Sequence, residues 1–222
     1  MNYHIGTMLI YEHFDGGNDC PLCRIKNEVD KRLTENYLGE GVMEDATRKE
    51  VNELGFCARH FDDLFSLQSK LGLALQSSTI LACVEKTVSD ANGVKKAKKI
   101  AYSLRKREKT CVVCKYLDEH MDRYCKTVAE VYLSDENFRD KIKNGGGFCL
   151  GHFSALLERS SYAGNEAKEY VSDLITAEKK RLSELGKDLE EFCDRHDYRN
   201  ADKPLGGGKD ALKNTRKTFY GL

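Results

Sequence analysis

Tryptophan is absent from the 222-residue chain, proline occurs only twice, and 36 basic side chains are balanced by 36 acidic ones. The scarcity of proline favours long helices, because proline is the residue that most often interrupts them. A formal net charge of zero excludes a global electrostatic field that would attract nucleic acid or an anionic membrane. The sequence also lacks an apolar run of the roughly 18 residues that a membrane-spanning helix needs.

The beginning of the chain and its cysteine content both bear on the compartment. Residues 1–5 lack the basic start and the apolar stretch of a secretory signal, so we expect a cytoplasmic protein with no membrane partner. In a reducing compartment, regularly spaced thiols bind metal more often than they form disulfides. The chain has nine cysteines, and this odd number also argues against a complete set of disulfide bridges.

Two kinds of short-range pair each occur twice in the sequence. The CxxC pairs are Cys20/Cys23 and Cys111/Cys114, and the CxxH pairs are Cys57/His60 and Cys149/His152. Each CxxH pair lies in the same block, Gly-Phe-Cys-x-x-His-Phe, and the second copy of each motif follows the first by 91 or 92 residues. We therefore infer an internal duplication. The predicted modules are residues 1–92 and 111–196, joined by a basic segment at 93–110 and followed by a polar tail at 197–222.

The segments between these pairs show the periodicity of amphipathic helices. Apolar residues recur every four positions after Cys23, and at spacings of three and four in 117–132 and 170–192. Glycines at 55 and 145–147 are expected to end the helices that precede the CxxH blocks, and Ser134 is expected to cap one of these helices. Because no alternating strand pattern appears, the sequence predicts an all-α fold of two tandem, duplicated helical modules.

Three thiolates and one imidazole suit Zn²⁺, which prefers four tetrahedral nitrogen or sulfur ligands. Two cysteines separated by two residues both reach one ion across a tight turn, and residues at i and i+3 share one face of a helix. We expect each CxxC pair to join the CxxH pair of its own module. The predicted sites are Cys20, Cys23, Cys57 and His60 in one module, and Cys111, Cys114, Cys149 and His152 in the other. A Cys₃His set leaves no open position for water, so two structural zinc ions per chain are predicted.

Other interpretations of these residues stay open. An iron–sulfur cluster with the same ligands is the less favoured cofactor. A redox-active CxxC dithiol would make the protein a thiol-based or metal-responsive sensor, although it leaves the CxxH pairs unexplained. Cys193 and His196 form a third CxxH pair without a matching CxxC, so packing is favoured over metal binding. His13 is near Cys20 in sequence and is an alternative ligand, but a surface or capping role is favoured.

The remaining motifs give weaker signals. Cys83 and Cys125 lie on apolar helix faces without a partner at metal-ligand spacing, so core packing is expected for both. The basic segment 95–109 contains apolar residues at helical spacing, which is typical of a connecting helix, and nucleic-acid binding there is the less favoured alternative. The sequence contains no HExxH, P-loop, GxSxG or dinucleotide-binding glycine motif, so catalysis has no support.

The paired blocks Cys-Pro-Leu-Cys with Gly-Phe-Cys-Ala-Arg-His, and Cys-Val-Val-Cys with Gly-Phe-Cys-Leu-Gly-His, resemble an uncharacterised family of bacterial and archaeal proteins. The tail sequence Asp197-Tyr198-Arg199 also resembles it, and the resemblance spans nearly the whole chain. It implies a soluble prokaryotic protein with cysteine-rich helical halves, and no established activity. The favoured function is therefore a zinc-binding helical module that contacts another protein or a small ligand, or that regulates such a contact.

Overall fold

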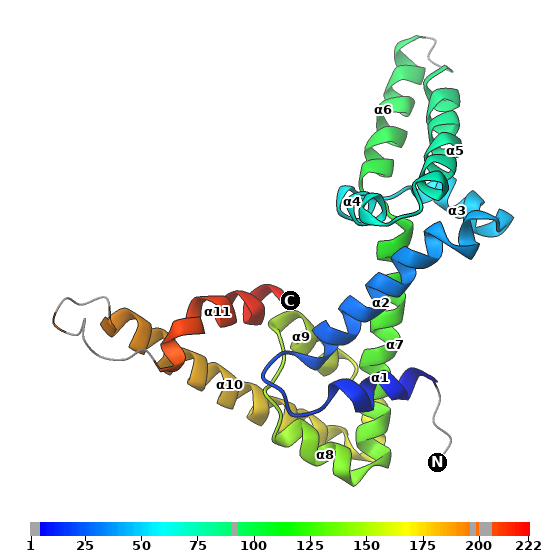
Figure 1. Cartoon of the computed structure of the whole chain (residues 1–222). Helices are drawn as coiled ribbons and strands as arrows, with labels where there is room; N and C mark the ends of the chain where they lie inside the picture. Colours follow the sequence, from blue (N-terminus) through cyan, green and yellow to red (C-terminus); the bar gives the residue numbers. More distant parts are fainter. Residues whose placement is uncertain (1–4, 90–92, 196–198, 200–205) are drawn as a thin grey trace. The chain divides into compact units, whose positions relative to one another are not determined.

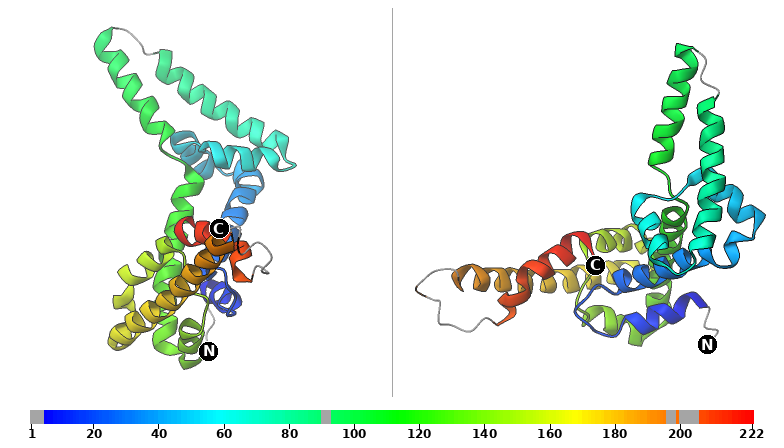
Figure 2. Two further views of the ribbon diagram at one scale, coloured as in Figure 1. Left: turned by 90° about the vertical axis from the view of Figure 1, so that its left-hand side faces the viewer. Right: turned by 45° about the horizontal axis from the view of Figure 1, so that its top comes forward.

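The computed structural model describes residues 5–89, 93–195, 199 and 206–222. Helices make up most of this part of the chain and no strand occurs in it, which confirms the predicted all-α class (Figures 1 and 2). The chain divides into two compact units. The first unit is Met1–Asn27 with Met121–Leu222, and the second unit is Glu28–His120. These units differ from the modules expected at 1–92 and 111–196, because the first unit joins two distant parts of the chain.

The second unit is built of several helices that pack around a small core. Its elements are the C-terminal part of α2 (Pro21–Leu38), η1 (Glu40–Val42), α3 (Asp45–Leu54), α4 (Ala58–Ser66), α5 (Lys70–Ser89), α6 (Val94–Glu108) and the start of α7 (Val112–Ser134). The core residues are Tyr37, Leu38, Val51, Leu64, Leu73, Cys111, Val112 and Val113. Because Cys111 belongs to this core, the second CxxC pair is held where α2, α3 and α4 pack.

The first unit has a larger core rich in aromatic residues. Its elements are α1 (Ile5–His13), the start of α2, the rest of α7, α8 (Glu136–Lys143), α9 (Leu150–Glu158), η2 (Ser160–Glu166), α10 (Ala167–Arg195), η4 (Gly207–Asp210) and α11 (Ala211–Tyr220). The rings of Phe14 and Phe138 lie 5.0 Å apart, and those of Tyr132 and Tyr170 lie 4.9 Å apart. Aromatic pairs at this distance stabilise a core beyond the apolar area they bury. They attach the segment directly after α1 to α8, and α7 to α10.

The helix boundaries largely follow the predicted stop signals. α3 ends at Leu54, before Gly55 with a φ of 68°, and α8 ends at Lys143, before the expected glycines. The expectation for Ser134 was wrong. Asp135 caps α8 by accepting hydrogen bonds from the backbone N–H groups of Asn137 and Phe138, whereas the Ser134 hydroxyl donates to a carbonyl of its own helix. A carboxylate at this position also favours the positive end of the helix.

Helices α5 and α6 run side by side as a hairpin within the second unit (Figures 1 and 2). The expected helix in the basic segment is confirmed as α6, which has no buried residue. Cys125 is buried as expected, but Cys83 is exposed on α5, so its expected core packing was wrong. In the described part of the chain, no helix is long and apolar enough to cross a membrane.

Candidate metal centres

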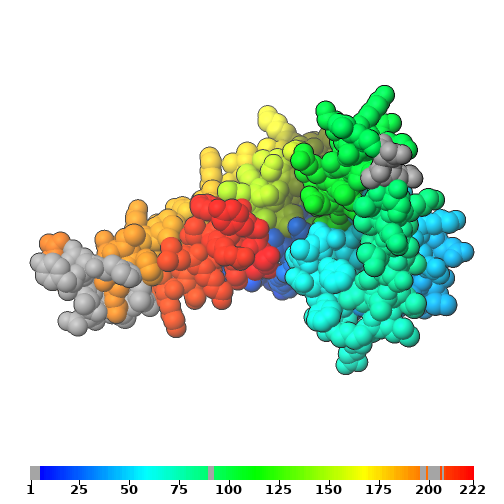
Figure 3. All heavy atoms as spheres, turned by 90° about the horizontal axis from the view of Figure 1, so that it is seen from above, coloured from blue at the N-terminus to red at the C-terminus, as the bar shows by residue number. Residues whose placement is uncertain are grey.

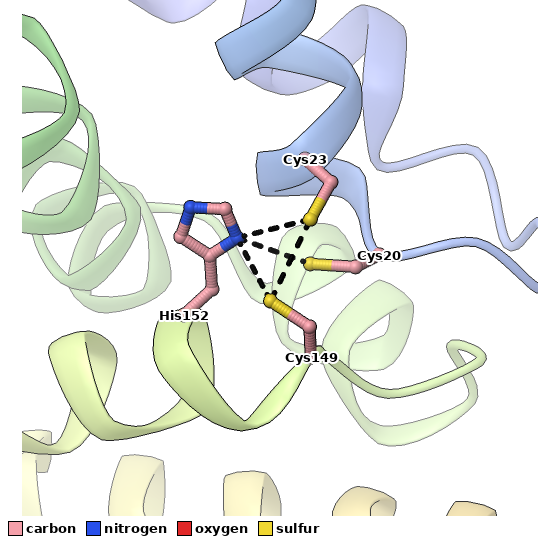
Figure 4. Close-up of side chains that lie close together, drawn as sticks. All are labelled: Cys20, Cys23, Cys149 and His152. Carbon is pink, nitrogen blue, oxygen red and sulfur yellow. Dashed lines mark hydrogen bonds between the residues drawn. The ribbon is translucent and has the colours of Figure 1, made fainter. Parts of the chain in front are cut away.

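The eight predicted ligands assemble into two tetrads in the structure. Group A consists of Cys20, Cys23, Cys149 and His152, and lies within the first unit (Figure 4). Group B consists of Cys57, His60, Cys111 and Cys114, and lies within the second unit. In each group, the four ligand atoms lie within 4.8 Å of one another.

The predicted pairing within each half of the sequence was wrong. Each CxxC pair joins the CxxH pair of the other half, so the structure exchanges the partners. Helix α2 gives one physical reason, because its 18 residues extend over about 27 Å and carry the chain away from Cys20 and Cys23. The first CxxH pair is reached only after that helix and α3.

Backbone contacts before the ligands explain which pairs meet. In the second unit, the N–H of Val112 donates to the Gly55 carbonyl at 3.0 Å, and the Thr110 hydroxyl donates to the Leu54 carbonyl at 2.8 Å. In the first unit, one guanidinium nitrogen of Arg181 donates to the carbonyls of Gly146 and Asn18 at 2.8 and 3.4 Å. The contacts of Val112 and Thr110 join the start of one CxxC pair to the segment before the CxxH pair of the other half. In the first unit, Arg181 bridges the corresponding two segments.

Glycine at 146 is required for this approach in the first unit. A Cβ atom at that position would lie only 2.6 Å from the Gly17 carbonyl oxygen, which is closer than real contacts allow. It would also lie 2.9 Å from the Cα atom of Asn18. Because both of these are backbone atoms, a side chain at position 146 would push the two segments apart. The glycine therefore lets the two segments that precede the group A ligands pack against each other.

Both groups form where the N-terminal ends of two helices meet. Cys57 and Cys149 are the N-cap residues of α4 and α9, with nearly identical φ values of −73° and −74°. Cys20 and Cys111 directly precede α2 and α7. The positive end of a helix stabilises a nearby anion, and it also favours the thiolate form of cysteine. Each tetrad is thus suited to hold negatively charged sulfur ligands.

Group A has the spacing of a tetrahedral site. His152 Nδ1 lies 3.5, 3.3 and 3.2 Å from the sulfurs of Cys20, Cys23 and Cys149, and the sulfurs of Cys23 and Cys149 are 3.5 Å apart (Figure 4). Zinc–ligand bonds of about 2.3 Å to sulfur and 2.0 Å to nitrogen give tetrahedron edges of roughly 3.5 Å between nitrogen and sulfur and 3.8 Å between sulfurs. These four distances therefore lie within a few tenths of an ångström of the spacing that one ion would impose.

Group B has the same spacing. His60 Nδ1 lies 3.3, 3.2 and 3.4 Å from the sulfurs of Cys57, Cys111 and Cys114. The sulfurs of Cys57 and Cys114 are 3.9 Å apart. Both histidines therefore turn the same ring nitrogen toward the three sulfurs, which leaves Nε2 directed away from the tetrad.

In group B, the outward-facing Nε2 of the histidine contacts a carboxylate. Nε2 of His60, a fully buried side chain, lies 2.8 Å from an oxygen of Asp30, whose other oxygen accepts a hydrogen bond from Arg59 at 2.7 Å. A carboxylate in this position fixes the histidine tautomer and strengthens the imidazole as a metal ligand. Asp30 lies seven residues after Cys23, and the position seven residues after Cys114 is Met121, which offers no carboxylate. Sequence motifs did not reveal Asp30, because only the fold brings α2 against His60.

The pKa values show that protons and charge are shared within each tetrad. Although burial opposes its charge, hydrogen bonds with Cys111 and Asp30 raise the pKa of His60 to about 9. Burial alone would raise the pKa of Cys111, but the hydrogen bond with His60 lowers it to about 6. Burial and the neighbouring sulfur of Cys111 raise the pKa of Cys114 to about 12. A divalent cation would replace the protons on the imidazole and the remaining thiols.

Group A shows the same sharing of charge. Burial opposes the charge of His152, but hydrogen bonds with Cys149 and Cys23 raise its pKa to about 9. Hydrogen bonds with Cys20 and Cys23 hold the pKa of Cys149 well below its usual range. Burial raises the pKa of Cys20. One thiolate is thus favoured beside an imidazolium in this tetrad too.

The other candidates from the sequence lie outside the tetrads. His13 belongs to neither group. Cys193 is exposed, and its CxxH partner His196 lies outside the described residues, as does part of the Asp197-Tyr198-Arg199 sequence.

No curated protein and no solved structure matches the sequence of this chain. The sequence profile of a family of unknown function, DUF6062, matches residues 1–221. The expected resemblance to an uncharacterised family is therefore confirmed, and the chain belongs to the family of unknown function DUF6062.

Proposed function

We propose that groups A and B each bind one Zn²⁺ and that both ions are structural. Four protein ligands complete a tetrahedral shell and leave no position for a catalytic water. Thiolate with imidazole suits zinc among the common divalent ions. An iron–sulfur cluster fits less well, because it distributes its protein ligands over several metal atoms, whereas each tetrad has the size of a single-ion site.

The observation that supports a clamping role is the sequence distance that each tetrad bridges. Cys23 and Cys149 are 126 residues apart, and His60 and Cys114 are 54 residues apart. An ion that joins such distant segments removes loop entropy from the unfolded chain. Binding to a structural site contributes on the order of 10 kcal/mol to folding, which is comparable with the net stability of a whole domain.

Metal content tests this proposal directly. We expect native mass spectrometry and elemental analysis to find two zinc ions per chain in protein purified without added metal. Cys57→Ser and Cys149→Ser are each expected to lose one ion, since they lie in different tetrads. A chain that carries no zinc, or a variant that loses both ions, would contradict two independent structural sites.

We further infer that the clamped helices form a cytoplasmic protein-binding module, with the α5–α6 hairpin as its contact surface. Helix α5 exposes 73% of Leu71 and 67% of Leu81, and α6 exposes 72% of Tyr102 (α5 is teal and α6 is green in Figure 3). Helices with this much apolar surface are ordinarily covered by another element. Helix α6 also carries seven basic residues and one acidic residue. An acidic, amphipathic helical segment of a partner protein would complement both surfaces.

A double charge reversal tests this surface. We expect Lys98→Glu/Lys99→Glu to lose proteins that the wild type retains in a low-salt affinity capture. The matched control is Lys179→Glu/Lys180→Glu, another exposed lysine pair on a helix, which is expected to retain them. Equal retention by both variants would contradict the surface. A shift of DNA or RNA mobility that Lys98→Glu/Lys99→Glu abolishes would instead favour the nucleic-acid alternative for residues 95–109.

A further inference from the structure

The sulfurs of group A are shielded from solvent. Cys20, Cys23 and Cys149 are each at most 4% exposed. The backbone of Gly221, which directly follows α11, covers two of them, since a Cβ atom there would lie 3.1 Å from the Cys23 sulfur and 3.8 Å from the Cys149 sulfur. Helix α11 is held in place by Lys217, whose ammonium group pairs with Asp19 at 2.8 Å.

Two cysteines of group B are less buried than those of group A. Cys57 and Cys114 are only half-buried, whereas Cys111 and His60 are buried. The sulfurs of these two half-buried cysteines are also neighbours, at 3.9 Å. A disulfide bond is about 2.05 Å long, so these sulfurs need to approach by about 2 Å to form one. Accessible thiolates react with oxidants in preference to buried ones.

We propose that group B is an oxidation site, at which a hydroperoxide converts Cys57 and Cys114 to a disulfide and expels the bound zinc. This inference rests on the proposed zinc binding and adds which of the two sites responds to an oxidant. A cysteine that binds zinc does so as a thiolate, which is the form of cysteine that attacks a peroxide.

The chemistry proceeds in two steps. One thiolate attacks a peroxide oxygen, the O–O bond breaks, and a sulfenic acid forms with release of hydroxide, or of alkoxide from an organic peroxide. The second thiolate then attacks the sulfenic sulfur, the S–S bond forms, and a second hydroxide leaves. Two protons from solvent neutralise these anions, so two thiolates are oxidised and one peroxide is reduced. Zinc is left with only Cys111 and His60 and dissociates, and reduction by a dithiol restores the site.

The experiment follows zinc and disulfides together during oxidation. The starting protein carries Cys83→Ser and Cys193→Ser, so it lacks the two exposed thiols that lie outside both tetrads. This protein is treated with hydrogen peroxide, and samples are analysed by native mass spectrometry and by peptide mapping after alkylation of the remaining thiols. We expect the zinc content to fall from two to one, with Cys57–Cys114 as the first disulfide. Group B is expected to react at least about tenfold faster than group A, and a dithiol with added zinc should restore two ions.

Removal of Gly221 and Leu222 provides a second variant, which acts on group A alone. We expect this truncation to accelerate zinc loss from group A in peroxide and to leave group B unchanged. A first disulfide between Cys20 and Cys23, equal rates at the two sites, or retention of both ions in peroxide would overturn the inference while the proposed zinc binding stands. Absence of zinc before oxidation would refute the proposed function itself, and with it the zinc release inferred here.

Discussion

The contact between Asp30 and His60 gives a quantitative test of how the second unit holds its metal. The carboxylate lies 2.8 Å from His60 Nε2 and also binds Arg59 at 2.7 Å. The hydrogen bonds from Arg59 and His60 outweigh the effect of burial and lower the pKa of Asp30, so the group is an anion at neutral pH. Asp30→Asn keeps the shape of the side chain but removes the charge that the imidazole contacts when Nδ1 binds the metal.

The expected loss follows from the effect of such outer contacts. Removal of a carboxylate behind a histidine ligand typically costs 10- to 100-fold in metal affinity, which corresponds to about 1.4 to 2.7 kcal/mol. Asp30→Ala should lie at the upper end of this range, because it leaves both His60 and Arg59 without their acceptor. Group A should keep its affinity, since neither of its ligand pairs contacts Asp30.

The assay is competition for zinc with a chromophoric chelator, measured in the Cys149→Ser background so that only group B contributes. Asp122→Asn is the matched control, because this aspartate pairs with Arg159 and Lys126 in the first unit. Its zinc affinity is expected to equal that of the background protein. If Asp30→Asn changes the affinity by less than about twofold, the carboxylate does not support His60 as a ligand and the argument fails.

Three further predictions follow from the tetrads and from the glycine beside group A. Chelation of zinc should lower the midpoint temperature of unfolding. Free zinc at 100 times the Kd should restore about 2.7 kcal/mol per site to the free energy of unfolding, as measured by calorimetry, and an unchanged midpoint would contradict structural ions. Zinc affinity should rise from pH 6 to pH 8, because His60 and His152 with pKa values of about 9, and Cys114 with a pKa of about 12, must lose protons on binding. Titration calorimetry in buffers of different ionisation enthalpy measures this proton release, and pH-independent binding would refute it. Gly146→Ala should lower the free energy of unfolding by about 1 to 3 kcal/mol through its clash with backbone, whereas Gly186→Ala in α10, where a Cβ meets nothing within 4 Å, should be neutral or stabilising in urea denaturation.

The sequence was sufficient to predict the helical class and the eight residues that form the two tetrads, but not which residues share a tetrad. Periodicity located the long helices, glycine marked the ends of α3 and α8, and the repeated CxxC and CxxH motifs named all eight residues that the structure brings together. These features are local, so they depend on spacings that can be read directly along the chain. Internal duplication stays a prediction, which the similar backbone geometry at Cys57 and Cys149 supports.

The sequence could not predict which CxxC pair shares a tetrad with which CxxH pair, and the reason is physical. The spacing from CxxC to CxxH is almost the same in both halves, so pairing within a half and pairing between halves satisfy the same ligand chemistry. The choice depends on tertiary contacts such as Val112 with Gly55 and Arg181 with Gly146. Cys83 was misassigned for a related reason, because an exposed apolar helix face has the same sequence periodicity as a face that packs in a core.

Alkylation mapping of one variant tests whether each CxxC pair shares its metal ion with the CxxH pair of the other half of the sequence. Zinc-loaded Cys149→Ser protein is treated with a thiol-alkylating reagent, and the modified cysteines are identified by mass spectrometry. Because Cys149 belongs to the tetrad of Cys20 and Cys23, we predict that these two cysteines become reactive while Cys111 and Cys114 stay protected by zinc. Modification of Cys111 and Cys114, with protection of Cys20 and Cys23, would contradict the exchanged arrangement.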